Sequence, residues 1–339
     1  ARGVRSEALP AGLGTRRFFR LHLDGPPGAL IARVEAPEDP AGRPAGSAPE
    51  PPLEPLRSWL EASGVPVPRS FGSDPVRGLD LLEDLGDRNL AQAVREGPAA
   101  RRHQLYAEIT ACVARLQRLG DAPTGLPAFR RRLDSLTLAY KAELFARWSL
   151  PDGTRPREAR QIAAAFEALA EHLADAPLRL AHRDLQSHNV MVPEGPAGPR
   201  WVLIDLQGAW LAPPEYDLVC LLRDSYVELP AEEVEAHLAR VRRELPDAPA
   251  PDVFRLRFDL LSLARKAKDH ARLRYVAATR GDARGLACLP ATVRALRSAA
   301  AGVRGLDPRI DALADAVERL PLVEGRLGAG ARGGTSCGA

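Results

Sequence analysis

The chain has 339 residues, of which 45% are hydrophobic and 27% are charged, and its net charge is +3. This length exceeds the usual size of one hydrophobic core, so two lobes or domains are expected. The hydrophobic content excludes a disordered chain, and the small net charge gives no general reason to expect nucleic acid or an acidic membrane surface as a partner. No apolar run approaches the ~18 residues of a membrane-spanning helix.

Four cysteines (Cys112, Cys220, Cys288 and Cys337) are scattered without a C-x-x-C pair. They fit reduced intracellular thiols better than a disulfide framework or a zinc site. The N-terminus shows no charged-then-apolar signal pattern. We therefore expect a cytoplasmic monomer that binds neither nucleic acid nor a membrane.

Two strands are predicted near the start of the chain, over residues 16–23 and 29–34. The sequence Gly-Leu-Gly-Thr precedes the first strand and supplies Gly12, Gly14 and Thr15. Glycines between extended runs let backbone N–H groups point at phosphate. Taken alone this motif fits a plain turn, but its place before a strand pair favours a loop that covers phosphates.

Protein kinases use a strand lysine to hold the α- and β-phosphates of the nucleotide. The first lysine of this chain is Lys141, so Arg33 on the second strand is the natural substitute. Its planar guanidinium can bind phosphate, although the same sequence also fits an arginine that faces solvent. A helical glutamate partner is expected next, and Glu54 is preferred over Glu61, although either can be a surface charge.

The predicted flexible insertion over residues 37–55 is rich in Pro, Gly and Ala. A strand farther along passes into a glycine-broken loop that ends at Asp87, where a two-lobed kinase has its hinge. Backbone groups of Glu83, Asp84 and Leu85 could pair with adenine there. The same residues also fit a strand end followed by a helix N-cap at Asp87, and both interpretations can hold together.

From residue 88 to 180, apolar residues recur at helical spacing and predict three buried helix faces. These faces are Leu105, Ile109, Cys112, Val113 and Leu116; Phe129, Leu133, Leu136, Tyr140 and Leu144; and Ile162, Phe166, Leu169 and Leu173. Residues 231–320 are also expected to be helical. The basic stretch from Arg265 to Arg274 within them fits a solvated face, or it helps to attract an anionic substrate.

Between these helical regions, one segment contains two short apolar runs that flank a Pro- and Gly-rich turn, with polar residues before and after them. This pattern predicts an antiparallel hairpin. Asp184 and Asn189 precede the hairpin and Asp205 follows it. If Val190 pairs with Ile204, Asn189 lies opposite Asp205 with their Cβ atoms about 5 Å apart. The hairpin would then set an amide oxygen beside a carboxylate.

This arrangement suits a divalent cation and a phosphate. Mg²⁺ prefers one or two protein oxygens, which Asn189 and Asp205 can supply, while Asp184 takes the proton of an attacking hydroxyl. An ordinary polar loop would explain any one of these residues. Protein kinases, however, place a catalytic Asp, an Asn five residues later and a metal-binding Asp after a β-turn, so the joint spacing favours a kinase-type site.

Several residues near these three are candidates for supporting roles. His188, Gln207 and Arg223 are candidates for substrate contact, and Arg223 could instead form an ion pair, as could Asp224. Asp217 follows two prolines at a predicted helix start. We expect Asp217 to cap that helix and to fix the loop behind the site, rather than to contact substrate.

The segments LAHRDLQSHNVMV and VLIDLQGAWLAPPEYDLVCLLRD resemble the aminoglycoside phosphotransferase and choline kinase superfamily. Three further segments are similar to the bacterial cell-wall amino-sugar kinases. They are LLEDLGD at the predicted hinge, TRRFFRL near the start of the chain, and FDLLSLARKAKDHARLRY. That group phosphorylates the anomeric hydroxyl of N-acetylmuramic acid and N-acetylglucosamine. The resemblance covers roughly residues 9 to 295.

The resemblance implies an α+β, bilobal, protein-kinase-like fold. A small N-terminal lobe with an antiparallel sheet (1–86) would precede a larger, mostly helical catalytic and substrate lobe (87–324) and a disordered tail (325–339). It also implies that Asp184 is the catalytic base, that Asn189 and Asp205 bind Mg²⁺, and that ATP is the phosphoryl donor. Residues 12–15 would cover the phosphates, and residues 83–85 would contact adenine.

The chain departs from the family pattern at the missing strand lysine, at Gln186 and His188, and at the insertion over residues 41–52. These departures bear on which sugar is used rather than on phosphoryl transfer. One alternative is an antibiotic-modifying kinase, whose acceptor pocket should be acidic, so the basic stretch argues against it. The other is a nucleotide-binding pseudokinase scaffold, which the missing lysine favours and the intact Asp/Asn/Asp set opposes.

Overall fold

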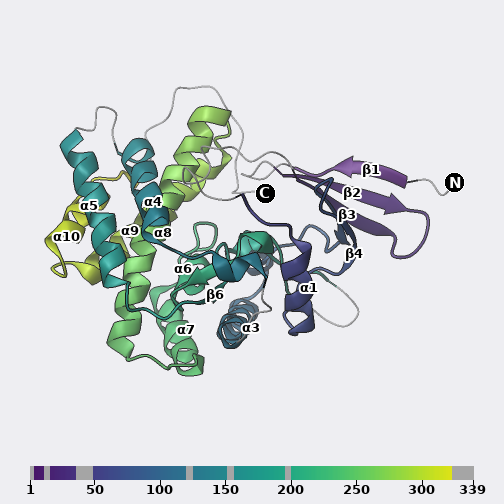
Figure 1. Cartoon of the computed structure of the whole chain (residues 1–339), viewed down its shortest axis with the longest axis horizontal. Coiled ribbons are helices and arrows are strands. Elements are labelled where there is room, and N and C mark those ends of the chain that lie inside the picture. Colours follow the sequence, from purple (N-terminus) through teal and green to yellow (C-terminus); the bar gives the residue numbers. More distant parts are fainter. Residues whose placement is uncertain are drawn as a thin grey trace.

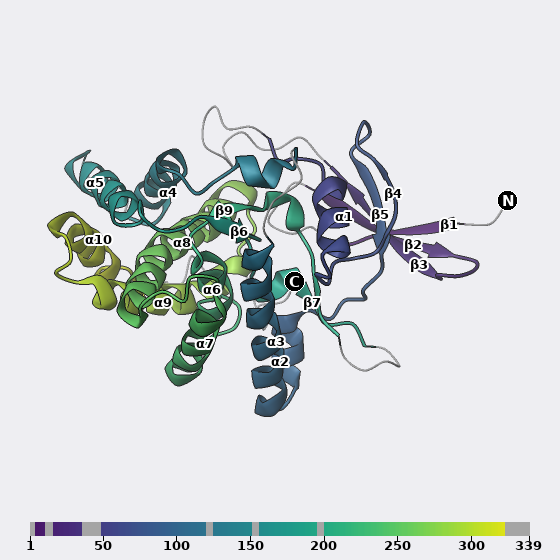
Figure 2. The same cartoon turned by 60° about the horizontal axis from the view of Figure 1, so that its bottom comes forward.

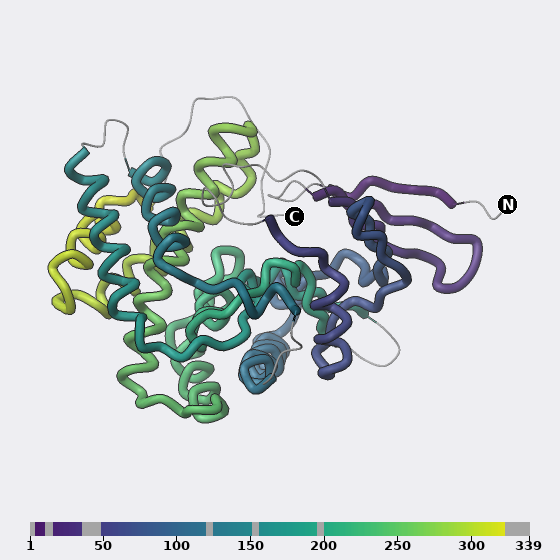
Figure 3. Tube along the Cα trace, in the orientation of Figure 1, coloured from purple at the N-terminus to yellow at the C-terminus, as the bar shows by residue number. Residues whose placement is uncertain are grey.

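The computed structural model describes residues 4–10, 16–35, 49–119, 125–150, 156–194 and 200–322. These residues form two lobes, a sheet-containing N-terminal lobe and a mostly helical C-terminal lobe (Figure 1). In the trace, the purple N-terminal strands lie at one end of the molecule and the green and yellow helices lie toward the other (Figure 3). The predicted fold class, α+β with the sheet first, is confirmed.

The N-terminal sheet is antiparallel throughout, in the order β1-β2-β3-β5-β4. Its strands are β1 (Val4–Ala8), β2 (Arg17–Leu23), β3 (Ala29–Val34), β4 (Ser70–Asp74) and β5 (Leu79–Glu83). β3 is the central strand, and its Leu30 and Ala32 are buried, as expected for a strand with period two. The two strands predicted from the sequence are β2 and β3.

Helix α1 (Glu54–Ala62) lies between the sheet and the helical lobe (Figure 2). Its Leu56 and Leu60 are 3% exposed and share one hydrophobic cluster with Leu82 of β5. The apolar face of α1 therefore covers the sheet on the side that faces the second lobe.

The predicted flexible insertion over residues 37–55 is wrong at its C-terminal end. Residues 36–48 lie outside the described residues, but Leu53 is 5% exposed and Glu54 already belongs to α1. Among the described residues of this range, the prolines next to the helix precede its N-cap or lie in its first turn. Proline is compatible with that turn because the first backbone N–H groups of a helix have no intrahelical acceptor.

The helical lobe packs around one long central helix. Its helices are α2 (Leu90–Glu96), α3 (Ala99–Arg118), α4 (Ser135–Trp148), α5 (Pro156–His172), α6 (Tyr216–Leu222), α7 (Ala231–Glu244), α8 (Pro251–Arg280), α9 (Leu289–Val303) and α10 (Pro308–Glu318). α8 has 30 residues and packs against α4, α6 and α9. Its Phe258 and Leu261 are fully buried. Among the described residues, no helix combines the length and the apolar character needed to cross a bilayer.

The buried faces predicted for the first and third helical stripes are those of α3 and α5. α4 buries a different face, because Leu136 is 53% exposed while Leu138, Ala142 and Phe145 are buried. The predicted stripe started in the segment before the helix, which begins only after its N-cap Asp134. Counting helical spacing from before the true start selected the wrong face.

The N-cap predicted at Asp87 is also wrong. Asn89 caps α2, and it forms a capping box in which its side chain accepts from Gln92 N while Gln92 accepts from Asn89 N. Asp87 is bonded to Arg20 of β2 instead. Asparagine and aspartate are equally favourable N-cap residues, so residue type alone does not distinguish Asn89 from Asp87. Asn89 is the cap because Gln92 stands three residues after it and completes the capping box.

Two pairs of short strands hold the segments that carry the candidate site. β6 (Arg179–Ala181) pairs with β9 (Trp210–Ala212), and β7 (Val190–Met191) pairs with β8 (Val202–Leu203). The second pair is the predicted hairpin, but Val190 pairs with Leu203 rather than with Ile204. The predicted register is therefore wrong by one residue. Leu203 N donates to the carbonyl of Pro66, a contact outside the hairpin that helps to fix the observed register.

Candidate active site

Residues 182–189 form a loop between β6 and β7, and two buried carboxylates hold its backbone. Asp217 accepts from the backbone N–H groups of His182 (2.7 Å) and Arg183 (3.0 Å), while Asp224 accepts from Ser187 N (2.9 Å). Asp217 was predicted to fix this loop, and it does. It lies in the first turn of α6 and does not cap it, because its carboxylate is directed at the loop.

Two residues of the candidate site, one of them in this loop, have a strained backbone. Arg183 has φ of 79° and Asp205, just after β8, has φ of 63°. Residues with a Cβ rarely adopt this left-handed region, and each instance costs of order 1–3 kcal/mol. The Arg183 side chain is anchored by Glu50 at 2.7 Å and by the ring of Trp210. These contacts and the bond from Arg183 N to Asp217 stabilise the unusual conformation.

His182 links this loop to the end of the hairpin. Its Nε2 donates to the carbonyl of Ile204 (2.9 Å), and its Nδ1 faces the N–H of Asp184 at 3.4 Å. Because a carbonyl oxygen only accepts, the ring carries its proton on Nε2. Asn189 adds a second link, since its carbonyl accepts from Ile204 N at 3.0 Å. The residue before Asp205 is thus bonded twice to the segment that carries Asp184 and Asn189.

The candidate metal ligands are held by hydrogen bonds that fix their orientation. Asn189 Nδ2 donates to the carbonyl of Asp184 (2.8 Å), so the amide oxygen points away from that bond. Asp205 Oδ1 accepts from Gln207 Nε2 at 2.6 Å and lies 3.4 Å from Arg16 Nη1. Gln207 was predicted to contact substrate. It is 2% exposed, and its bond to Asp205 favours a role in positioning that carboxylate.

Helix α8 supplies the part of the site that the sequence did not reveal. Arg265 Nη1 donates to Asp184 Oδ1 (2.6 Å) and to the carbonyl of Arg183 (3.1 Å), and its Nε lies 3.2 Å from Asp269. The predicted solvated face is wrong here, because Arg265 and Lys266 are 3% and 2% exposed. The visible signal was Asp269, which stands four and three residues after these two cations, at helical ion-pair spacing.

The cations around Asp184 control its protonation. Burial by itself would raise the pKa of Asp184, but the charges of Arg265, Lys268 and Arg183 outweigh this effect and hold the pKa well below its usual range. Oδ1 is engaged by Arg265, whereas Oδ2 lies 3.9 Å from Arg183 Nε, beyond hydrogen-bond distance. Asp184 is therefore ionised at neutral pH.

The predicted arginine of β3 is linked to Asp205 only indirectly, through Glu35 and Arg16. Arg33 is 4% exposed and bonds Asp80 (2.7 Å) and Glu35 (2.5 Å) within its own lobe. Glu54, its predicted helical partner, bonds Arg57 at 2.8 Å instead. Arg16 is the N-terminal-lobe arginine that lies beside Asp205, and sequence reasoning missed it. Its position directly after the Gly-Leu-Gly-Thr motif was the available signal.

Only some of the other residues predicted to contact the nucleotide are among those that the structure describes. Gly12, Gly14 and Thr15 lie outside the described residues. At the end of β5, Leu85 is buried, while Asp84 bonds Arg20 at 2.6 Å and Glu83 pairs with Arg200. Glu83 N already donates to the carbonyl of Arg69 at 2.8 Å.

The two remaining substrate candidates differ in surroundings. His188 stacks on Tyr226 with ring centroids 3.8 Å apart, and burial lowers the pKa of its imidazole. Arg223 lies 3.2 Å from Asp259 and over the ring of Phe258, so the predicted alternative, an ion pair, is what the structure contains.

The donor set fits a hard divalent cation. Among the described residues, no group of three or more His, Cys, Asp and Glu side chains could hold a metal ion. One amide oxygen and one carboxylate, from Asn189 and Asp205, match the sparse protein coordination that Mg²⁺ adopts when substrate phosphates complete its shell.

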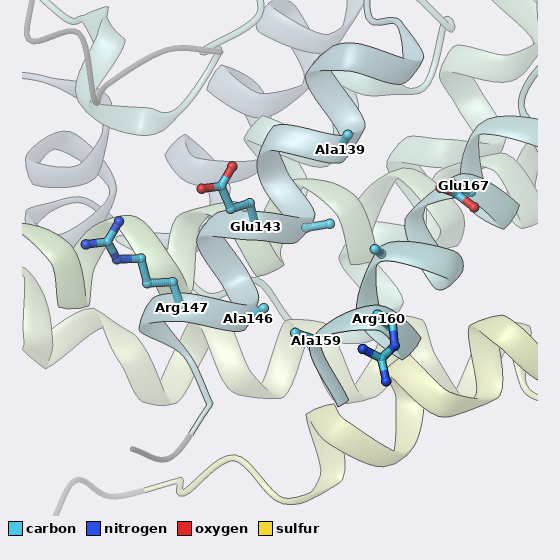
Figure 4. A pocket seen from close by; sticks show the side chains of 9 residues that line it. Ala139, Glu143, Ala146, Arg147, Ala159, Arg160 and Glu167 are labelled. Carbon is cyan, nitrogen blue, oxygen red and sulfur yellow. The ribbon is translucent and has the colours of Figure 1, made fainter. Parts of the chain in front are cut away.

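A separate groove of about 460 Å³ lies between α4 and α5 (Figure 4). Alanines and four charged side chains line it, among them Glu143, Arg147 and Arg160. It contains none of the predicted site residues, so it is not part of the candidate active site.

Residues 6–255 match the phosphotransferase enzyme family (APH). The chain belongs to this family. It is 30% identical over 281 residues to an N-acetylmuramate/N-acetylglucosamine kinase of Caulobacter vibrioides (72% of this chain, 74% of the relative). It is 26% identical over 307 residues to a protein of the same name from Pseudomonas aeruginosa (87% and 84%).

The fold is also that of solved kinases. A choline/ethanolamine kinase family protein from Mesorhizobium loti aligns over 92% of both chains with a TM-score of 0.56 and 18% sequence identity. Family membership makes this protein an enzyme that phosphorylates a hydroxyl acceptor, and the resemblance stated from its sequence is confirmed.

Proposed function

We propose that this enzyme transfers the γ-phosphoryl group of ATP to the anomeric hydroxyl of N-acetylmuramic acid and N-acetylglucosamine. The observation that carries the proposal is the ionised Asp184, held beside Asn189 and Asp205 by a fixed and strained loop. The relatives named N-acetylmuramate/N-acetylglucosamine kinases support the choice of sugar. In this role the enzyme would act in the cytoplasm on sugars recovered from the cell wall.

In the proposed reaction, the acceptor oxygen attacks the γ-phosphorus while the bond from that phosphorus to the β–γ bridging oxygen breaks. ADP leaves, and the hydroxyl proton passes to Asp184. A carboxylate with a low pKa is a weak base, but an anomeric hydroxyl is more acidic than an ordinary alcohol, so a weak base is adequate. Positioning of the two reactants supplies most of the catalysis.

Asn189 and Asp205 would hold Mg²⁺, which neutralises charge on the transferring phosphoryl group when it is bound. In the N-terminal lobe, we assign the phosphate-covering loop to Gly12, Gly14 and Thr15. The adenine contact is assigned to the backbone at residues 83–85. Buried Leu85 at the passage between the lobes supports that assignment.

The antibiotic-kinase alternative is less well supported. Aminoglycosides are polycations, and they would meet Arg265 and Lys268 beside Asp184, where like charges repel. The scaffold alternative is opposed by family membership and by Arg265, because a scaffold has no need of an oriented base.

The test is ³¹P NMR of the products formed from ATP, Mg²⁺ and each candidate acceptor. We expect a sugar 1-phosphate, identified by coupling between phosphorus and the anomeric proton. The methyl glycoside of N-acetylglucosamine is the matched control, since its anomeric oxygen is blocked and it should not react. Phosphorylation of the glycoside would refute the anomeric assignment, and faster turnover of kanamycin would favour the antibiotic alternative.

A further inference from the structure

The cations of helix α8 outnumber the carboxylates with which they form ion pairs beside Asp184. Helix α8 contributes Arg265, Lys266 and Lys268, and these three cations face two carboxylates, Asp184 and Asp269. Arg183, a further cation near Asp184, is paired with Glu50, which it shares with Arg16. One positive charge of the α8 cluster is therefore in excess.

Lys268 is the most loosely paired of the three cations. Arg265 and Lys266 make contacts of 2.6 Å and 2.9 Å to carboxylates, and their side chains are 4% and 2% exposed. Lys268 Nζ lies 3.5 Å from Asp269, whose carboxylate also serves Arg265 and Lys266, and its side chain is 28% exposed. The excess charge is thus on Lys268, which a solute can reach.

Lys268 belongs to the same charged cluster as the base, because it shares Asp269 with Arg265, which is bonded to Asp184. The charge of Lys268 accordingly helps to lower the pKa of Asp184. Burial and the like charge of Arg265 lower the pKa of Lys268 itself. A cation that is partly desolvated and crowded by another cation is stabilised by an anionic partner.

We propose that Lys268 binds an anionic group of the acceptor and determines the preference for an acidic amino sugar over a neutral one. This inference rests on the proposed function. N-acetylmuramic acid carries a lactyl carboxylate that N-acetylglucosamine lacks, so the two sugars differ in the group that a lysine recognises. Arg265 is excluded from this role because its guanidinium is bonded to Asp184 and Asp269.

The test compares the two sugars in Lys268→Met. We expect the KM for N-acetylmuramic acid to rise roughly 10- to 100-fold, the range for a lost charge-assisted hydrogen bond, while the KM for N-acetylglucosamine changes far less. Lys268→Arg should restore most of the affinity for the acidic sugar. Lys268→Glu should weaken it further, because the introduced carboxylate repels the lactyl group.

Lys266→Met is the matched control from the same helix. Lys266 Nζ donates to Ser225 (2.7 Å) and Asp269 (2.9 Å) inside the protein, so its loss should lower the melting temperature and affect both sugars alike. Circular dichroism melts of all variants separate folding defects from recognition.

Equal losses for both sugars in Lys268→Met would overturn the inference, since Lys268 would then act on the phosphoryl donor or on Asp184. No change for either sugar would overturn it as well. If the unaltered enzyme phosphorylated neither sugar, the proposed function itself would fail, and this inference with it.

Discussion

Each lobe of the enzyme buries an arginine between carboxylates. Arg33 of β3 bonds Asp80 and Glu35, and its side chain is 5% exposed. Arg265 of α8 bonds Asp184 and Asp269, and its side chain is 4% exposed. The two guanidinium groups are thus buried to a similar degree, and each is bonded to two carboxylates.

They differ in what their partners connect. Both partners of Arg33 belong to the N-terminal lobe, and only Glu35 also binds Arg16, the residue beside Asp205. Arg265 joins α8 to a loop that lies 81 residues earlier in the chain, and that loop carries the candidate base. The burial of a charge therefore does not reveal its role, because the role depends on which segments the charge holds together.

The largest effect is expected from substituting the carboxylates that these two arginines bind. Asp184→Asn removes the proton acceptor and should lower kcat by about 10³-fold, within the range for general-base catalysis. Asp80→Asn, which removes the corresponding partner of Arg33, should lower stability and leave kcat nearly unchanged. Steady-state kinetics and urea unfolding of both variants measure the difference, and full activity in Asp184→Asn would disprove the assigned base.

The next effect concerns the arginines themselves. Arg33→Met leaves the buried carboxylate of Asp80 without its cation and should destabilise the fold by about 3 kcal/mol. Arg265→Met should destabilise it less, because the side chain of Asp184 is 25% exposed and Asp269 keeps its lysine partners. Only Arg265→Met should also change the pH dependence of kcat/KM. Without Arg265 the pKa of Asp184 rises, so the base becomes protonated at a higher pH and the acidic limb of the profile moves upward.

Stability should follow the same linkage. The pKa of Asp184 is lowered on folding, so its stabilisation is present above the ordinary value near 3.8 and is lost as the pH falls through the folded value. Arg265→Met should weaken this dependence and Arg33→Met should not. A raised KM for ATP in Arg33→Met would contradict the contrast between the arginines, and would support the phosphate contact predicted from the sequence.

The smallest effect comes from a buried charge without such a partner. Glu215 is fully buried, neither carboxylate oxygen has a hydrogen-bond partner in another described residue, and burial raises its pKa to about 7. Folding then favours the protonated form, so stability is lost as the pH rises from 4.5 through 7. Glu215→Gln should stabilise the protein by about 2–3 kcal/mol at pH 8 and by far less at pH 5.

Urea unfolding at the two pH values measures this gain. Equal stabilisation at pH 5 and pH 8 would indicate a change in packing rather than the removal of a charge. Destabilisation at pH 8 would show that Glu215 has a partner after all.

The parts that the sequence could predict are those set by local spacing. Strands β2 and β3 and the buried face of α3 follow from periods of two and 3.6 residues. The spacing of Asp184, Asn189 and Asp205 likewise pointed to one shared site, and the structure brings these segments together.

The parts that the sequence could not predict depend on distant partners. The register of the hairpin is supported by a bond from Leu203 to Pro66, which no local pattern encodes. The burial of Arg265 depends on Asp184, and a run of basic residues in a helix looks the same whether or not such a partner exists. Charged side chains are buried only when they are paired, so the pairing must be known first.

Glu50 binds one arginine from each lobe. Arg16 lies beside Asp205, and Arg183 belongs to the loop that carries Asp184. If the two lobes moved apart, one of these ion pairs would break. If the pair with Arg183 breaks, the left-handed backbone at that residue loses an anchor at the same moment. A shift of the N-terminal lobe would thus reach the loop of Asp184 through a single carboxylate.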